Sequence, residues 1–165
     1  MSIANMIRKV TLADAPVITS IYNRYIEETT ISFEEAPLSE SEMAERIREI
    51  SASFPYYVYE VDGQIAGYCY AHKWKERAAY GHTLETTIYL APRYLHHGVG
   101  TLLMKRLIDD CRKAGYRALI ACITGGNEAS IGLHRSLGFE QVSHFKNVGM
   151  KFGKMLDVVD LELEL

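Results

Sequence analysis

The sequence predicts a mixed α/β domain built around one central sheet. Strand-like and helix-like segments follow one another along the 165 residues in the order β-α-α-β-β-β-α-β-α-β-β. One stretch, residues 84–104, passes from a strand into a helix through two glycines. A second stretch, residues 118–123, is apolar at every position, which is typical of a strand covered on both faces. We therefore expect a single domain spanning residues 1–165.

The composition is that of an ordinary globular protein, with 48% hydrophobic and 24% charged residues. A net charge of −3 provides no positive field, so we expect neither nucleic acid nor a membrane surface as a partner. No apolar run is long enough to span a membrane, and the first residues lack the pattern of a secretory signal. Cys69, Cys111 and Cys122 are far apart and odd in number. They indicate buried thiols in a reducing cytoplasm and no metal site.

The first elements are a strand and a helix. Residues 7–10 alternate as in a strand, and Asp14 followed by Pro16 is typical of a helix start. This helix has an apolar stripe made of Val17, Ile18, Ile21, Tyr22, Tyr25 and Ile26. Residues 29–37 then form a loop that carries Phe33 between polar neighbours.

A second helix and a hairpin follow. Ser39 and Glu42 have the spacing of a capping box at the start of the helix. Residues 56–61 and 64–72 read as strands around an Asp-Gly dipeptide, which is typical of a two-residue hairpin. Residues 73–81 form a wider loop before the next strand.

The stretch at 84–104 organises the rest of the chain. The β-branched and aromatic residues at 86–89 predict a strand, and the apolar repeat that starts at Val99 predicts a helix. Gly98 and Gly100 at the helix start allow backbone N–H groups to approach a ligand closely. Because a helix N-terminus favours anions, we expect a phosphate-binding site here. The alternative is an ordinary strand–helix connection, since neither the P-loop nor the dinucleotide pattern is present.

The C-terminal part contains a second informative motif. A buried strand at 117–123 is followed by a short helix from residue 127 to 136, and then by strands at 139–142 and 155–165. Asn127 and His134 are seven positions apart, which places them on roughly the same helix face. Taken alone, Asn127 is consistent with an ordinary helix cap and His134 with a packing histidine.

Together, Gly98-Val99-Gly100 and the run of Asn127, His134 and Leu137-Gly138-Phe139 resemble the GNAT superfamily of acetyl-CoA-dependent N-acetyltransferases. The resemblance covers almost the whole chain. It implies the GNAT fold, with a central twisted, mostly antiparallel sheet and flanking helices. It also implies acetyl-CoA as the co-substrate, and a homodimer in which the C-terminal strands often contribute.

Segments at 21–27, 74–85, 130–134 and 148–157 are similar to the branch that acetylates phosphinothricin and methionine sulfoximine. The resemblance implies acetyl transfer to the amino group of phosphinothricin, methionine sulfoximine or methionine sulfone by direct attack. Two alternatives stay open. One is a GNAT enzyme for another amine, such as a polyamine or a protein N-terminus, and the other is a non-catalytic acyl-CoA-binding module.

The resemblance also assigns a set of acetyl-CoA-binding residues: Ile88, Tyr89, Leu90, Leu95, His96, His97, Gly98, Val99, Gly100, Thr101, Asn127 and Ser130. The chain departs from the family pattern at Leu95, where Arg or Gln is usual, and at His96, where this branch usually has Gly. Met155 stands where the branch commonly has Trp. Because backbone N–H groups hold most of the diphosphate, we expect binding to survive, with a protonated His96 or His97 compensating.

Glu85 matches the proposed base of the family. Proton transfer from a lysine-like ammonium to an ordinary Glu is uphill by roughly six pKa units, or about 8 kcal/mol. We therefore favour a water relay, while a raised pKa, simple ammonium binding or a solvent-facing carboxylate are the alternatives. The N–H near Ile88 is the expected donor to the acyl oxygen. His134 stands where much of the superfamily has Tyr, and is our candidate general acid for the CoA thiolate; the alternative is a packing histidine.

The loop before Glu85 supplies candidate substrate residues. Arg77 offers a planar fork for a carboxylate or phosphinate, and Phe33, Trp74 and Tyr80 offer apolar walls. Of these we favour Arg77, Phe33 and Tyr80. The alternative is a solvated basic loop with a packed Trp.

Overall fold

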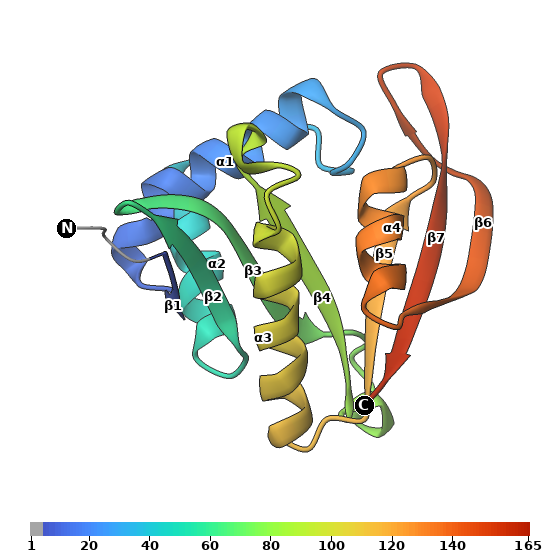
Figure 1. Ribbon diagram of the computed structural model, residues 1–165. Coiled ribbons are helices and arrows are strands. Elements are labelled where there is room, and N and C mark those ends of the chain that lie inside the picture. Colours follow the sequence, from blue (N-terminus) through green and yellow to red (C-terminus); the bar gives the residue numbers. More distant parts are fainter. Residues whose placement is uncertain (1–4) are drawn as a thin grey trace.

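The computed structural model describes residues 5–165 as one seven-stranded sheet in the order β1-β2-β3-β4-β5-β7-β6, flanked by helices (Figure 1). The strands are β1 (Met6–Lys9), β2 (Tyr56–Val61), β3 (Gln64–Lys73), β4 (Thr83–Leu90), β5 (Ala118–Thr124), β6 (Glu140–Lys151) and β7 (Lys154–Glu164). The helices are α1 (Ala15–Glu28), α2 (Glu40–Ser51), α3 (Val99–Lys113) and α4 (Glu128–Ser136). Short 3-10 turns lie at η1 (Leu12–Asp14), η2 (Ala78–Tyr80) and η3 (Pro92–Tyr94).

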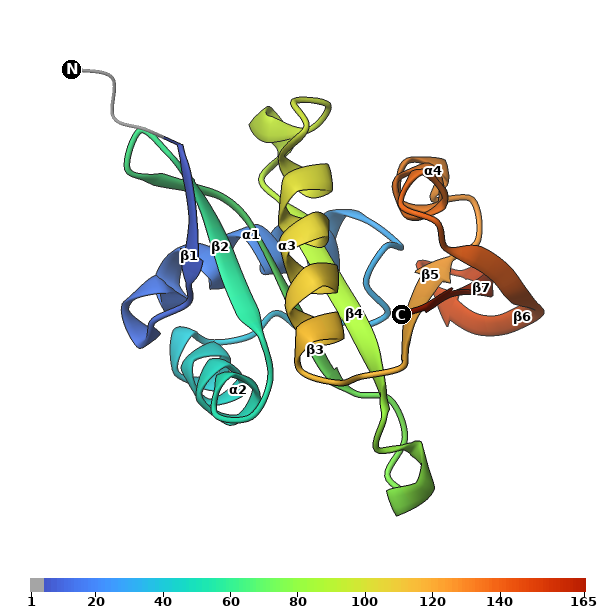
Figure 2. The same ribbon diagram turned by 60° about the horizontal axis from the view of Figure 1, so that its bottom comes forward.

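The predicted fold class and element order are confirmed. Every pair of neighbouring strands is antiparallel except β4 and β5, which are parallel. Helices α1 and α2 cover one face of the first four strands, and α3 covers the other (Figures 1 and 2). Helix α4 lies on the α3 side, over β5.

Two clusters of buried side chains correspond to these layers. The larger joins α3 to the sheet through residues such as Leu103, Leu107, Leu119 and Leu161. The smaller lies under α1 and α2, where Ile18 and other apolar residues pack against Tyr68. Burial of these side chains is the main stabilising contribution, at roughly 1.5–3 kcal/mol for each large apolar residue.

Local signals in the sequence account for the element boundaries. Ser39 accepts a hydrogen bond from the Glu42 N–H at 3.1 Å, and the Glu42 carboxylate accepts one from the Ser39 N–H at 2.8 Å. This is the predicted capping box. In the hairpin between β2 and β3, Asp62 and Gly63 have φ angles of 51° and 78°, as a two-residue turn requires.

Two predictions about the C-terminal part are wrong. The strand expected at 139–142 is β6, which starts after the buried Phe139 and continues to Lys151. Register shifts at Gln141/Ser143 and Phe145/Gly149 disrupt the alternation by which a strand is recognised. The apolar run of β5 is also not covered throughout, because Cys122 is exposed.

The pairing of β4 with β5 is unusually short. It comprises three residue pairs, from Thr83↔Ala118 to Glu85↔Ile120, after which the two strands diverge (Figure 1). We call these pairs the seam. Beyond the seam, the side of β4 that faces β5 has no strand against it.

Candidate active site

A cavity of about 780 Å³ lies between the diverging strands. Its walls come from the second part of β4, the end of β5, the start of α3, one face of α4 and the loop after α1. Within residues 5–165 there is no helix long and apolar enough to span a membrane. The same residues include no group of three His, Cys, Asp or Glu side chains placed to hold a metal ion.

The start of α3 forms one end of the cavity. Gly98 is the N-cap residue, with a φ of 80° that favours glycine. The first helical bond runs from the Leu102 N–H to the Gly98 carbonyl, so the N–H groups of Val99, Gly100 and Thr101 precede the helical ladder. A Cβ at Gly100 would lie 3.2 Å from Leu133, so glycine keeps this turn close to α4. These features fit a bound diphosphate.

The open edge of β4 supplies further backbone groups. The Arg117 N–H donates to the His82 carbonyl at 2.8 Å, so His82 presents its backbone groups toward β5. Strand alternation gives Thr86, Ile88 and Leu90 the same direction. The Leu90 carbonyl accepts a hydrogen bond from the Tyr25 hydroxyl, whereas Ile88, which pairs with β3 on its other side, lies where no described residue of β5 pairs with β4. An extended ligand fits along this edge as a strand would.

Glu85 lies at the seam and lines the cavity. It is paired across the strands with His72, whose Nε2 is 3.3 Å from Glu85 Oε2. The Cys122 thiol donates to Glu85 Oε1 at 3.5 Å. Although the residue as a whole is exposed, its sulfur is partly desolvated; this desolvation, followed by the nearby Glu85 and Asp160 charges, raises the pKa of the thiol, which therefore stays protonated. Each oxygen of the carboxylate thus has a polar neighbour, the His72 ring on one side and the Cys122 thiol on the other.

His134 lines the other side of the cavity and is 2% exposed. Its Nδ1 lies 2.7 Å from the Ser130 carbonyl, and its ring packs edge-on against Phe139 at 5.0 Å between centroids. A carbonyl can only accept, so Nδ1 carries the proton and neutral Nε2 has a free lone pair. Burial lowers the pKa of His134, although the hydrogen bond to Ser130 opposes this. The resting ring is therefore a proton acceptor at Nε2.

The loop after α1 closes the remaining side, and Phe33 is its apolar contribution. The Phe33 ring packs directly on Gly149 of β6, where a Cβ would come within 2.4 Å of it. Lys151, which is 3% exposed, donates to the Ser32 carbonyl at 2.7 Å. The β6–β7 hairpin thus holds the loop in place.

Most of the predicted site residues line this one cavity. They are Phe33, Glu85, Ile88, Tyr89, Leu90, Leu95, His96, Gly98, Gly100, Thr101, Asn127, Ser130 and His134. Asn127 caps α4 by accepting from the Ser130 N–H at 3.3 Å, which is one of the roles considered for it.

Five predicted residues lie elsewhere. His97 is exposed and does not line the cavity, and Val99, the first residue of α3, is buried in the cluster between α3 and the sheet. Trp74, Arg77 and Tyr80 belong to the turn between β3 and β4, which projects away from the sheet (Figure 2). Trp74 packs edge-on against Tyr80 there, at 5.4 Å between ring centroids, and none of the three lines the cavity.

Sequence reasoning missed several residues of the cavity wall. Tyr22 and Tyr25 belong to the predicted apolar stripe of α1, but both also reach the cavity. Glu34, Tyr70 and His72 also line it. The strand alternation that places Tyr70 and His72 beside Glu85 becomes visible only when the register of β3 with β4 is known.

Comparisons with known proteins agree with this geometry. The sequence profile described as the acetyltransferase (GNAT) domain matches residues 7–159. A phosphinothricin N-acetyltransferase of Alcaligenes faecalis is 42% identical over 161 residues, covering 96% of this chain and 82% of the relative. An L-methionine sulfoximine/L-methionine sulfone acetyltransferase of Salmonella typhimurium is 32% identical over 160 residues, covering 96% of this chain and 94% of the relative.

The fold is shared with solved structures of such proteins. A GNAT superfamily phosphinothricin acetyltransferase from Sinorhizobium meliloti, solved in complex with acetyl-CoA, superimposes with a TM-score of 0.95 and 36% identity. The alignment covers 100% of this chain and 89% of that one.

Proposed function

The chain belongs to the GNAT acetyltransferase family as an acetyl-CoA-dependent N-acetyltransferase, and we propose that its acceptor is the amino group of a small amino-acid analogue. Phosphinothricin, methionine sulfoximine and methionine sulfone are the proposed acceptors, because relatives named for these substrates align with nearly the whole chain. One structural observation carries the proposal. A single cavity joins the free N–H groups of α3 to the Glu85 carboxylate.

Acetyl-CoA supplies a thioester carbonyl to the amine when it is bound. The N–H groups at the start of α3 hold its diphosphate, and the open edge of β4 aligns its extended arm. The Ile88 N–H donates a hydrogen bond to the acyl oxygen, where negative charge develops during attack. These donors are already fixed in the fold, so little reorganisation is required.

The direct attack that we propose requires two protons to leave the amine. Glu85 takes the first proton of the ammonium through water and releases it to solvent, aided by the His72 ring that lies against the carboxylate. His134 accepts the second proton from the amine nitrogen at its free Nε2. It returns this proton to the departing sulfur, so it acts as general acid only after this first transfer. Because burial lowers its pKa, His134 is neutral and ready to accept at pH 7.

The acceptor lies at the Glu85 end, against the apolar wall that includes Phe33. No Lys or Arg of the described chain lines the cavity. A carboxylate or phosphinate therefore requires a cation from outside this wall, and Arg77, exposed on the turn before β4, stays our proposed residue.

The acidic side chains that line the cavity suggest a second candidate function, acetylation of an amine that has no carboxylate. Glu34 and Glu85 both line the cavity. Glu34, however, is paired with Arg46, whose Nη2 lies 2.6 Å from Glu34 Oε1, so one acidic group is already neutralised. This pairing favours the amino-acid analogue over a polyamine.

Thiol release from acetyl-CoA tests the acceptor. Purified protein is assayed with phosphinothricin, methionine sulfoximine, methionine sulfone, spermidine and a peptide amine. We expect release with the first three only, and a loss of about tenfold or more in kcat/KM for Arg77→Ala, with Lys75→Ala as the neighbouring control. Release with spermidine alone supports the second candidate function.

The proposed homodimer uses the C-terminal hairpin. Six large apolar residues on β6, its turn and the start of β7 are at least half exposed: Val142, Phe145, Val148, Met150, Phe152 and Met155. An apolar group of this size on one hairpin is typical of a protein–protein contact. We expect light scattering to give a dimer, and Phe145→Asp with Met150→Asp to give a monomer. Val17→Asp, an exposed apolar residue of α1, is the control and leaves the dimer intact.

A further inference from the structure

The loop between α1 and α2 extends from α1 toward the β6–β7 hairpin and closes one side of the cavity (Figure 1). Four consecutive residues of this loop line the cavity: Ile31, Ser32, Phe33 and Glu34. Within the described chain, residues 30–37 nevertheless form no backbone–backbone hydrogen bond. The shape of the loop therefore depends on side chains that reach its polar groups.

Side chains from β5 and β6 hold the main chain of the loop. The Thr124 hydroxyl, at the end of β5, donates to the Thr30 carbonyl at 2.9 Å and lies 3.3 Å from the Ile31 carbonyl. The Lys151 ammonium, at the end of β6, donates to the Ser32 carbonyl at 2.7 Å. Two side chains thus hold three successive carbonyl groups.

Side chains from α1 and α2 hold the loop on its other side. The Tyr22 hydroxyl lies 2.9 Å from the Ser32 hydroxyl and also donates to Glu34. Arg46 of α2 donates to both Glu34 oxygens, at 2.6 and 3.0 Å. The loop is therefore bound to both sides of the cavity, and loss of either set of bonds leaves it held from one side only.

Lys151 differs from Thr124, because it does not itself line the cavity. Its side chain is 3% exposed, and within the described chain the Ser32 carbonyl is its one hydrogen-bond acceptor. Burial of an ammonium is costly, so packing of the hairpin alone does not account for a lysine here. Any effect of Lys151 on the acceptor must pass through the loop.

We propose that Lys151 is a positioning residue of the acceptor site, which holds the loop so that the Phe33 ring lies against the bound amine. Phe33 packs on Gly149, which precedes Lys151 by two positions and so lies on the same face of β6. The hairpin thus contacts the loop at two adjacent points. The inference rests on the proposed function for the amine, and adds a determinant of its binding that lies outside the cavity.

Steady-state kinetics test this role, with acetyl-CoA and the amine that gives the fastest thiol release among the five assayed. Lys151→Met keeps an unbranched side chain but cannot donate a hydrogen bond. We expect KM for the amine to rise about tenfold, the scale of one hydrogen bond to a charged group. The turnover number kcat and the KM of acetyl-CoA should stay within about twofold of wild type, because the loop touches neither Glu85 nor the start of α3.

Two further variants serve as comparisons. Lys151→Arg can still donate to the Ser32 carbonyl and should recover most of the affinity for the amine. Lys154→Met, at an exposed position on the same hairpin, is the matched control and should behave as wild type.

A double-mutant cycle shows whether the effect passes through Phe33. In a Phe33→Ala background, Lys151→Met should change KM for the amine by less than about twofold, because the ring that it positions is gone. A full tenfold effect in that background would overturn the proposal, since Lys151 would then act by another route.

Limited proteolysis follows the loop without relying on activity. A glutamate-specific protease cleaves after Glu34 and Glu35, and mass spectrometry identifies each cut. Cleavage at these two sites should be about tenfold faster in Lys151→Met than in wild type or Lys154→Met. Cleavage after Glu49, which lies in α2, should be unchanged if only the loop is released.

Unchanged cleavage at Glu34 and Glu35 in Lys151→Met would overturn the proposal, as would faster cleavage with an unaltered KM for the amine. Equal acceleration at Glu49 would also overturn it, because Lys151 would then stabilise the whole fold. If the wild type releases thiol with none of the amines, the proposed acceptor is wrong. The cleavage rates then decide separately whether Lys151 holds the loop.

Discussion

The sheet has two halves that are built differently. Strands β1 to β4 are covered by α1 and α2 on one face and by α3 on the other (Figure 2). Strands β5, β7 and β6 have α4 on one face, and no helix of the described chain covers their opposite face (Figure 2). The large exposed apolar residues of the second half are all on one hairpin, β6–β7. In the described part of the first half, such residues are spread over several elements.

The difference separates stability from function. The first half contains the whole of the buried cluster under α1 and α2, so it is the more completely packed. The second half supplies one wall of the cavity and the hairpin that holds Phe33. The proposed base Glu85 lies where the halves meet, at the end of the seam. Substitutions in the three regions should therefore have different signatures.

The largest effect is expected at the seam. Glu85→Gln keeps the shape of the side chain but cannot accept a proton, so kcat should fall by about 10² or more. Acetyl-CoA affinity and melting temperature should stay near wild type. Glu76→Gln, on the exposed turn before β4, is the control. Normal turnover in Glu85→Gln would exclude the proposed base.

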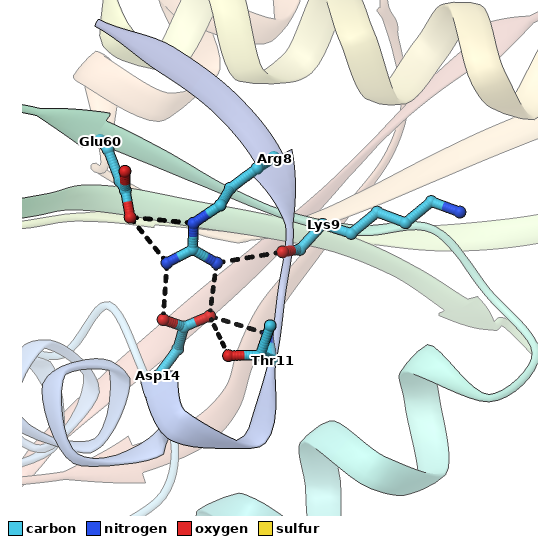
Figure 3. Close-up of polar contacts among 5 residues, drawn as sticks. All are labelled: Arg8, Lys9, Thr11, Asp14 and Glu60. Carbon is cyan, nitrogen blue, oxygen red and sulfur yellow. Dashed lines mark hydrogen bonds and ion pairs between the residues drawn. The ribbon is translucent and has the colours of Figure 1, made fainter. Parts of the chain in front are cut away.

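A substitution in the first half should instead affect stability. Arg8 of β1 donates to both Asp14 oxygens at 2.8 Å and to Glu60 at 2.9 Å, joining β1, β2 and the start of α1 (Figure 3). We expect Asp14→Asn to lower the free energy of unfolding by about 2 kcal/mol, the size of hydrogen bonds to charged groups. Turnover per folded molecule should be unchanged, as measured by denaturation and active-site titration.

The difference in unfolding free energy between wild type and Asp14→Asn should depend on pH, in a direction set by the pKa of Asp14. Burial acts to raise the pKa of Asp14, but the hydrogen bonds from Arg8 and Thr11 outweigh it and lower the pKa. The stabilisation is therefore present above about pH 3.9, the ordinary Asp value, and is lost as pH falls through the lowered value. A gap between Asp14→Asn and wild type that widens in acid would contradict this.

In the second half, a small change should alter substrate binding. The added Cβ of Gly149→Ala would come within 2.4 Å of the Phe33 ring and displaces it. We expect KM for the amine to rise about tenfold with kcat retained. The free energy of unfolding should fall by only about 1 kcal/mol. Gly132→Ala on α4 is the matched control, because its Cβ meets nothing within 4 Å. Equal KM values in the two variants would remove Phe33 from the substrate wall.

The smallest effect is expected from His72, which orients Glu85 without replacing it. Loss of the polar contact with Glu85 in His72→Phe should lower kcat about three- to fivefold. His72→Gln, which can still donate, should recover part of this loss. Lys73→Gln, at the exposed end of β3, should behave as wild type. If His72→Phe is as damaging as Glu85→Gln, the residue moves the proton itself.

Most of the fold follows from local signals in the sequence. Ser39 and Glu42 cap a helix, an Asp-Gly dipeptide forms a hairpin, and Gly98 starts α3, each within a few residues. The length of β6 is underestimated from the sequence because its pairing with β7 shifts register twice. No periodicity reveals such a strand, since its partner determines where it continues.

The sequence motifs predict the cavity wall only as far as they extend. Residues on β4, the α3 turn and α4 lie together because each motif is continuous in the chain. His72 and Cys122 were missed, since they reach Glu85 through strand register and have no motif of their own. Arg77 was placed at the substrate by its chemistry, but its turn projects beyond the cavity wall.

The divergence of β4 from β5 also bears on aggregation. An unpaired strand edge normally recruits the edge of another chain, and proteins protect such edges with charges, proline or a covering element. Here the unpaired edge is internal, between β4 and β5, and the Tyr25 hydroxyl occupies the Leu90 carbonyl at its end. A foreign sheet cannot enter a wedge closed at the seam, whereas a single extended molecule can. The fold thus keeps hydrogen-bonding groups open to a small ligand without offering them to another polypeptide.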